Sequence, residues 1–243
     1  FEAAFAAYIG TAGAVAVSNG TSALYIALEA MGVGRGDEVI VPPLTFFATV
    51  SSVLYLGAVP VFADLDLDDL CLSPASVEEQ ITPRTRAILP VHLFGAAAKM
   101  DRLLEIAERH GIPVLEDCAQ AHGTEYLGRK TGSLGRAGAF SFFATKHMTT
   151  GEGGMITTND PDIVKTAKIL RSHGMTGRDD HIMLGYNNRM TEMEAAMGLV
   201  QLGKLEDIRR LYRALYELYE GELRPIAEKG DRVPPVGPPE CTP

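Results

Sequence analysis

Cysteine is scarce in this sequence, and its placement excludes two kinds of small scaffold. The 243 residues contain three cysteines, Cys71, Cys118 and Cys241, which lie far apart along the chain. Structural zinc sites need closely paired ligands, and disulfide frameworks need an even number of cysteines. Neither pattern is present, so we expect Cys71 and Cys118 to be ordinary buried thiols.

Positive charge is also in deficit. The chain has 22 lysines and arginines against 31 aspartates and glutamates, which gives a net charge of −9. Binding to the phosphates of a nucleic acid needs a basic surface, so this balance argues against a general nucleic-acid-binding protein. It still allows a small anionic ligand held by a few local donors.

Long hydrophobic runs are missing as well. No stretch approaches the roughly 20 apolar residues that span a bilayer, and the first residues, F-E-A-A-F-A-A-Y, lack the basic flank of a signal peptide. We therefore expect no membrane contact and a cytoplasmic location. The composition, 46% hydrophobic with 25 glycines, suffices for the core of one large domain or of a domain plus a fragment.

Short apolar runs alternate with segments of helical spacing. The runs are bounded by Gly, Pro or Asp, so we expect mostly buried strands, at 38–41, 59–63, 87–91, 114–116, 139–143 and 155–158. Helices are predicted at 22–31, 45–56, 74–80, 100–110 and 162–171, and Ser73 before Pro74 is a typical helix start. This alternation predicts an α/β fold with a largely parallel sheet and helices on both faces. Ligands of such sheets bind beyond the carboxyl ends of the strands.

The pattern changes near residue 191. From there to about residue 222 we expect one long helical stretch with a bend, leading out of the large domain. The tail at 231–243 contains five prolines without periodicity, so no regular structure is expected there. We therefore assign residues 1–212 to a large domain, and 213–243 to the helix end and the start of a smaller domain.

The run from Gly138 to Gly154, G-A-F-S-F-F-A-T-K-H-M-T-T-G-E-G-G, places one lysine, Lys146, between an apolar strand and a glycine-rich turn. A lysine at the edge of a packed core is partly desolvated, which lowers its pKa and exposes a nucleophilic amine suited to Schiff-base chemistry. A solvated loop lysine is the ordinary alternative.

Polar residues also lie at the end of one predicted strand and at the start of one predicted helix. Asp117 ends a strand, where its carboxylate could pair with the protonated ring nitrogen of a cofactor or cap a turn. Asn19, Gly20, Thr21 and Ser22 precede a helix, whose first N–H groups form a phosphate cradle or receive an ordinary cap.

Further candidates complete a set of cofactor contacts. Phe46 could stack on a flat ring, whereas we expect Phe47 to pack in the core. Ser141, five residues before Lys146, could donate to a phosphate or satisfy a neighbouring carbonyl. Asn187 and Asn188 form a polar turn. A Schiff-base lysine, a pyridinium partner, a stacking ring and phosphate donors are together what pyridoxal 5′-phosphate (PLP) requires.

The sequence resembles the DegT-type (DegT/DnrJ/StrS) sugar aminotransferases, a branch of the fold-type I PLP enzymes. The resemblance spans about residues 15 to 210 and rests on S-N-G-T-S-A-L, G-D-E-V-I-V-P-P-L-T-F-F-A-T, V-L-E-D-C-A-Q-A-H-G, F-S-F-F-A-T-K-H-M-T-T-G-E-G-G and G-Y-N-N-R-M-T-E-M-E-A-A-M-G. It implies a PLP-binding large domain with a mostly parallel mixed sheet. The run T-K-H-M-T-T-G-E-G-G is similar to that of perosamine-synthase-like members.

The resemblance also implies a role for each matching residue. Lys146 would carry the cofactor, Asp117 would pair with its ring nitrogen, and Gln120 would lie near the ring or its oxygen. Thr21, Ser22 and Ser141 would hold the phosphate, with Phe46 stacked on the ring. Members of the family are homodimers that share their active sites, and Asn187 matches the asparagine that enters the partner's site.

Two departures from the family pattern concern the substrate. Where members commonly have H-L-Y-G-Q-P, this chain has H-L-F-G-A-A at 92–97. Members also begin earlier and continue into a C-terminal domain of roughly a hundred residues, within the usual domain size. We therefore expect a fragment or a shortened homologue that lacks part of the substrate site.

The resemblance implies transamination between glutamate and a nucleotide-linked keto-deoxysugar, with a 4-keto-6-deoxyhexose as the leading substrate. One alternative is a non-catalytic PLP- or ligand-binding regulatory homologue. Another is a sugar dehydratase of the family, in which histidine replaces the lysine, and Lys146 argues against it. For His122 and His147 we favour structural packing over a pocket role, and the role of His92 is left open.

Overall fold

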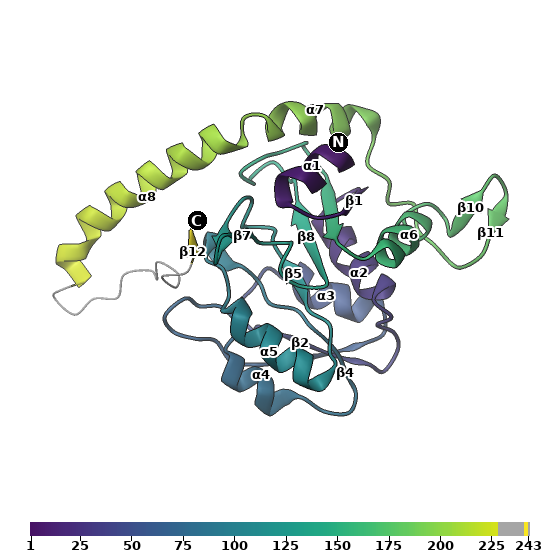
Figure 1. The fold of residues 1–243 in the computed structure, drawn as a ribbon, viewed down its shortest axis with the longest axis horizontal. Helices are drawn as coiled ribbons and strands as arrows, with labels where there is room; N and C mark the ends of the chain where they lie inside the picture. The colour runs from purple at the N-terminus through teal and green to yellow at the C-terminus, as the bar shows by residue number, and fades with distance from the viewer. Residues whose placement is uncertain (228–240, 243) are drawn as a thin grey trace.

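A mixed sheet forms the centre of the computed structural model, which describes residues 1–227 and 241–242 (Figure 1). Parallel bridges from Ile88 to Val114 and from Val91 to Asp117 join its two parts. Every pairing in the sheet is parallel except those of β9, which runs antiparallel to both neighbours. The first part has the order β1 (Gly13–Val17), β9 (Gly154–Thr158), β8 (Ala137–Ser141) and β5 (Leu115–Asp117), and the second β3 (Val59–Phe62), β2 (Glu38–Val41) and β4 (Thr85–Ile88).

Helices cover both faces of this sheet, as the α/β pattern predicts (Figure 1). One face carries α2 (Gly20–Ala30), α3 (Ala48–Tyr55) and α6 (Pro161–Leu170), and the other α1 (Glu2–Ile9), α4 (Pro74–Gln80) and α5 (Met100–His110). The remaining elements are the 3-10 turn η1 (Leu93–Gly95), the strands β6 (Glu125–Tyr126), β7 (Arg129–Lys130), β10 (Met175–Gly177), β11 (Asp180–His181) and β12 (Cys241–Thr242), and the helices α7 (Glu192–Leu202) and α8 (Leu205–Ala227).

The alternation of side chains along each strand explains this layering. Val39 and Val41 of β2 pack under α2 and α3, whereas Ile40 between them packs under α4 and α5. In β8, Ala139 faces α2, and Phe140 faces Phe5 of α1, with ring centroids 5.0 Å apart. Because successive strand residues point to opposite faces, apolar residues at consecutive positions build two cores from one sheet. None of the described helices is long and apolar enough to cross a membrane.

Several predicted elements match the structure, and others need correction. The strand at 38–41 and the helices at 74–80 and 100–110 have the predicted bounds. The sequence did not predict α1, β1 or the short strands β6, β7, β10 and β11. The segment 59–62 is an edge strand with exposed ends, so it is an exception among the mostly buried strands that were predicted. Ser73 does precede α4, but its side chain makes no capping hydrogen bond.

Local chemistry accounts for the other shifts in element bounds. Strand β4 ends at Ile88 rather than at 91, because Pro90 has no N–H for the ladder. Helix α3 begins at Ala48 rather than at 45, after the Pro-Pro turn. The expected long helix from 191 is two helices, α7 and α8, interrupted at residues 203–204.

The end of the chain differs in part from the prediction. Strand β12, Cys241–Thr242, pairs antiparallel with β6, so this part of the tail is regular. The rest of the tail lies outside the described residues. Helix α8 continues through residues 212 and 213 and extends away from the sheet, where its side chains from 211 to 219 are exposed (Figure 1). The division into two domains near residue 212 stays a prediction.

A buried carboxylate locks the end of β5. Glu116 accepts hydrogen bonds at 2.7 to 2.8 Å from three backbone N–H groups of the loop 132–135. His92 donates to Glu116 from Nε2 at 3.0 Å, because its Nδ1 already accepts the N–H of Ala98 at 3.1 Å. Cys118 lies close enough to His92 and Glu116 for a metal site, but hydrogen-bond donors occupy both Glu116 oxygens. The cluster is therefore a structural network, and Cys71 and Cys118 are buried thiols as predicted.

His122 is another buried polar side chain near the sheet's carboxyl edge. Its ring packs against Phe140 and Phe142 and is 3% exposed. Nε2 donates to the carbonyl oxygen of Ser141 at 2.8 Å, and burial lowers the pKa of the ring from 6.5 to about 3. The ring therefore stays neutral in the folded chain at any pH above that value.

His122 should make the stability of the protein fall in mild acid. Below about pH 6.5 His122 is protonated in the unfolded chain but stays neutral in the folded chain. The free energy of unfolding therefore decreases as the pH falls toward 3. In His122→Gln, an amide N–H replaces the ring N–H and the titration disappears. Denaturant unfolding from pH 7 to 4 should then show a slope against pH shallower by up to about 1.4 kcal/mol per pH unit. Equal slopes for parent and variant would contradict the buried neutral ring.

Candidate functional site

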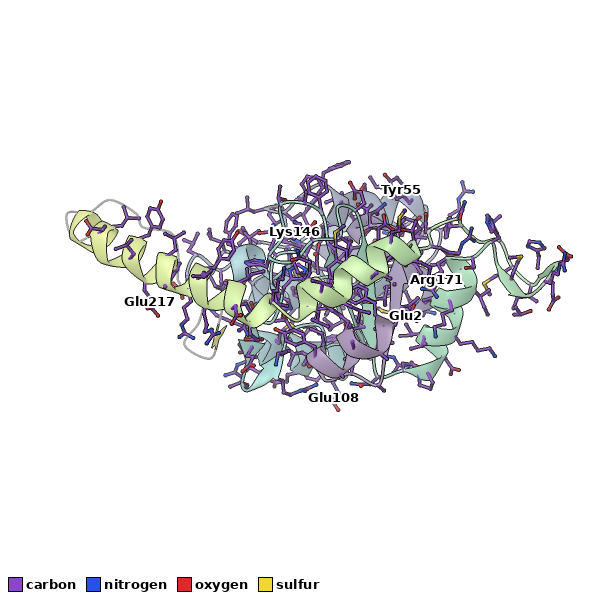
Figure 2. All side chains as sticks on the ribbon, turned by 90° about the horizontal axis from the view of Figure 1, so that it is seen from above. Glu2, Tyr55, Glu108, Lys146, Arg171 and Glu217 are labelled. Carbon is purple, nitrogen blue, oxygen red and sulfur yellow. The ribbon has the colours of Figure 1, made fainter. Side chains whose placement is uncertain are left out.

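A cavity of about 760 Å³ opens at the carboxyl edge of the sheet. Its wall comes from the segments that follow β1, β2, β5 and β8, which is where a doubly wound sheet binds ligands. Figure 2 shows Lys146 and Tyr55, which both border it, toward one side of the molecule and Glu108 toward the opposite side. Seven of the predicted site residues line this cavity, namely Thr21, Ser22, Phe46, Asp117, Gln120, Ser141 and Lys146.

Lys146 lies in a tight turn after β8. Its backbone N–H donates to the carbonyl oxygen of Phe143 at 2.9 Å, and Phe143 forms a bridge with Gly151 that closes the loop. The side chain is half-buried, and this burial lowers the pKa of its amine, while the negative charge of Asp117 opposes the shift. Burial thus favours the neutral, nucleophilic form of the amine.

Asp117 is buried at the end of β5 and held in place by three contacts. Oδ2 accepts the hydroxyl of Thr49 at 2.9 Å, Oδ1 accepts the N–H of Ala119 at 3.1 Å, and its own N–H donates to Pro90. Burial raises the pKa of the carboxyl, against the smaller opposing effects of these donors and of Lys146. A buried carboxyl of this kind gains most from a cationic partner placed in the cavity.

The start of α2 forms a polar corner of the cavity. Asn19 caps the helix by accepting the N–H of Ser22 at 2.8 Å, and the N–H of Ala23 donates to the Asn19 carbonyl. Within the described chain, no acceptor is recorded for the N–H groups of Gly20 and Thr21. Such free N–H groups at a helix start bind anions.

A close backbone approach builds this corner. A Cβ on Gly20 would lie 2.7 Å from the Cβ of Ser141, and one on Gly154 would collide with the backbone of Asn19. Glycine at both positions therefore lets the first turn of α2 pack against the ends of β8 and β9. The Ser22 hydroxyl is buried and shares a hydrogen bond of 3.1 Å with Ser18, which leaves Thr21 and Ser141 as the more accessible hydroxyls.

Phe46 and Gln120, the residues predicted to lie beside the cofactor ring, both border the cavity. Phe46 borders the cavity with 74% of its surface exposed. Gln120 also borders it, and its Oε1 accepts the N–H of Phe94 at 2.9 Å. Phe47 is 66% exposed, so its predicted core packing is wrong. It precedes α3 on the surface, where the helix start turns the side chain away from the core.

Asn187 is the one predicted site residue outside the cavity wall of this chain. It is exposed, and a bridge with Ser172 holds its backbone. Its neighbour Asn188 lines the cavity instead and donates from Nδ2 to the hydroxyl of Tyr25. The alternation of an extended segment accounts for the difference, because adjacent side chains point in opposite directions.

Sequence reasoning missed several residues of the wall. Thr45 and Thr49 are four residues apart and share a hydrogen bond of 2.7 Å, which places Thr49 against Asp117. The signal was the i, i+4 spacing of the two threonines in T-F-F-A-T. Tyr25 and Tyr55, with ring centroids 5.8 Å apart, form another part of the wall that no local motif marked.

The groups around the cavity fit pyridoxal phosphate. Asp117 supplies a buried carboxyl that favours a cationic ring nitrogen, and the two glycines leave space for backbone donors near a phosphate. Lys146 supplies a partly desolvated amine for the aldehyde. Charge and hydrogen-bonding capacity therefore match at each end of the cofactor.

Comparison with known proteins agrees with this chemistry. GDP-perosamine synthase of Caulobacter vibrioides is 48% identical over 235 residues, covering 96% of this chain and 62% of the relative. L-glutamine:2-deoxy-scyllo-inosose aminotransferase of Streptomyces kanamyceticus is 44% identical over 247 residues, covering 97% and 58%. The chain thus spans about three fifths of the length of these relatives.

Solved structures give the same result. DesV of S. venezuelae, in complex with a ketimine intermediate, superposes with a TM-score of 0.93 at 42% identity, covering 100% of this chain and 65% of that chain. Spr1654 of Streptococcus pneumoniae, in its PLP form, has a TM-score of 0.87 at 32% identity, with 92% and 63% covered. A PMP form of Spr1654 is also known.

The sequence model of one family matches residues 1–236, nearly the whole chain. Members of that family use pyridoxal 5′-phosphate, the cofactor that the cavity fits. The chain therefore belongs to the DegT/DnrJ/EryC1/StrS aminotransferase family.

Proposed function

We propose that this protein transfers an amino group from glutamate to the ketone of a nucleotide-linked keto-deoxysugar, with a 4-keto-6-deoxyhexose as the leading substrate. The observation that carries the proposal is the meeting of Lys146, Asp117 and the start of α2 at one cavity. These three come from distant segments, and each supplies a different part of the required chemistry. The similarity to GDP-perosamine synthase supports the choice of sugar.

Pyridoxal phosphate, when bound, supplies an aldehyde that links to amines and a ring that stores electrons. Lys146 would hold it covalently, and Asp117 would keep its ring nitrogen protonated. The free N–H groups of Gly20 and Thr21, with the hydroxyls of Thr21, Ser22 and Ser141, would bind the phosphate. Phe46 would cover the ring, and Gln120 would lie beside it.

Lys146 would also move the proton in each half of the reaction. Its amine would take the proton from the α-carbon of the amino donor and pass it to the aldehyde carbon of the cofactor. In the second half it would carry that proton to the former ketone carbon. An amine with a lowered pKa suits both directions, because it is neutral often enough to accept a proton. Asp117 contributes by its charge, since it neither gains nor loses a proton in these steps.

The site would be completed by a second copy of the chain. Asn187 is exposed outside its own cavity, as expected of a residue that enters the partner's site. Phe46, Phe47 and Tyr55 are exposed, and Phe46 and Tyr55 border the cavity; exposed apolar groups of this size favour an interface. A homodimer with shared sites accounts for both features.

Covalent attachment of the cofactor tests the role of Lys146. Borohydride treatment of the protein with bound pyridoxal phosphate, followed by peptide mass spectrometry, should find the reduced cofactor on Lys146. Lys146→Ala should carry no label there and lose turnover, whereas Lys165→Ala, an exposed lysine of α6, should behave as the parent. Label on another lysine would contradict the assignment. A labelled parent that no amino donor converts to the pyridoxamine form would favour a non-catalytic binding protein.

Mixing two inactive variants tests the shared site. Lys146→Ala and Asn187→Ala disable different halves of a site, so a hybrid dimer keeps one intact site, and an equal mixture should recover about a quarter of the parent's activity. Lys146→Ala mixed with Asp117→Ala is the matched control, because those two residues belong to the same half and no intact site can form. A mixture of the first pair that stays inactive would rule out this use of Asn187.

A further inference from the structure

A second, smaller hollow of about 320 Å³ lies next to the cofactor cavity. Its wall consists of Phe94, Gln120, Thr145, Lys146 and His147, and we call it the Phe94 pocket. Three of these residues, Gln120, Thr145 and Lys146, also line the larger cavity. The side chain of Lys146 therefore lies on the boundary between the cofactor cavity and the Phe94 pocket. The proposed cofactor would occupy only the cofactor cavity.

Phe94 has an unusual backbone for its size. It adopts φ 54° and ψ 23° inside η1, the left-handed region that bulky residues rarely enter. Such a conformation is strained and is found mostly at functional sites. A hydrogen bond of 2.9 Å from the Phe94 N–H to Gln120 Oε1 stabilises this backbone conformation. Its result is an aromatic ring that is 76% exposed at the wall of the pocket.

The remaining wall of the pocket is polar and, apart from Lys146, uncharged. Gln120 and Thr145 are neutral, and burial together with the nearby charges of Lys146 and Arg209 lowers the pKa of His147. The Nδ1 atom of His147 is buried and has no hydrogen-bond partner within residues 1–227 and 241–242. No partner is recorded in that part of the chain for the amide nitrogen of Gln120 either. The pocket thus offers an exposed aromatic face and the amide nitrogen of Gln120, whereas the Nδ1 of His147 is buried behind the wall.

We propose that the Phe94 pocket seats the sugar ring of the keto-sugar substrate, with the Phe94 ring against its C–H face and the amide of Gln120 bonded to its hydroxyls. This inference rests on the proposed function and names the place of one of its two substrates. A sugar ring presents apolar C–H groups on its face and hydroxyls around its edge, which matches an aromatic ring beside neutral polar groups.

The amino donor fits this pocket less well than the sugar. Glutamate carries two carboxylates, and buried carboxylates need cationic partners or several donors. Lys146 is the one cation in the wall of the Phe94 pocket, and the reaction uses its amine. The volume, about 320 Å³, also lies within the range of roughly 300–1,000 Å³ found for small-molecule sites.

Substitutions at Phe94 separate sugar binding from the rest of the reaction. Phe94→Asn removes the ring but tolerates the left-handed backbone, and Phe94→Tyr keeps the ring. Phe62→Ala, which removes an exposed phenylalanine from edge strand β3 outside both pockets, is the matched control. Two quantities are measured for each: the rate of the half-reaction with glutamate, and the Kd of a nucleoside-diphosphate 4-amino-6-deoxyhexose by calorimetry on protein that carries pyridoxamine phosphate, which cannot react with an amine.

Phe94→Asn should weaken binding of the amino-sugar by about tenfold, the usual effect of losing one apolar contact surface, and leave the glutamate half-reaction unchanged. Phe94→Tyr and Phe62→Ala should bind it as the parent does. An unchanged Kd in Phe94→Asn would overturn the proposal, as would an equal slowing of the glutamate half-reaction. A parent that never reacts with an amino donor would instead remove the proposed function, and this inference with it.

Discussion

The burial of Asp117 is the constraint on which the rest of the site depends. A carboxyl at this depth is stable as an anion only if donors and a cation surround it. Thr49 and Ala119 supply two donors, but burial still raises the pKa of the carboxyl. The site is therefore incomplete without a positive partner, and the protonated pyridine nitrogen of the proposed cofactor would provide one.

The topology of the sheet brings Lys146 and the start of α2 to the same edge as Asp117. Strands β5 and β8 are parallel neighbours, so Asp117 and the loop with Lys146 emerge at one edge. Strand β9 runs the opposite way, and its first residue, Gly154, meets the start of α2 at this edge. The network of Glu116 and His92 fixes the last residues of β5 from the other face. Each of these groups is thus anchored by contacts between neighbouring strands, helices and loops.

Much of this arrangement could be predicted from the sequence. The bounds of β2, α4 and α5 were predicted correctly. Pro74 marks the start of α4, an apolar run marks β2, and a clear apolar stripe at helical spacing marks α5. Seven of the predicted site residues line one cavity because each follows a strand or begins a helix, positions that converge in an α/β sheet.

Other features depend on contacts that local patterns do not encode. Strand β1 pairs with β9, which lies some 140 residues away, so its short Ala-Val run carries no clear signal of its own. Phe47 was predicted to be buried because phenylalanine usually packs in a core, but the turn into α3 leaves it on the surface. The Phe94 pocket brings together three separate loops, and the left-handed backbone at Phe94 appears in no motif.

The most direct test of this account is the protonation state of the bound cofactor's ring nitrogen. Nitrogen-15 NMR of the protein loaded with ring-labelled pyridoxal phosphate reports it without turnover. We predict a protonated nitrogen at neutral pH in the parent and an unprotonated one in Asp117→Asn, because the buried carboxylate supplies the compensating charge. An unprotonated nitrogen in the parent, or the same signal in both proteins, would contradict the central role of Asp117.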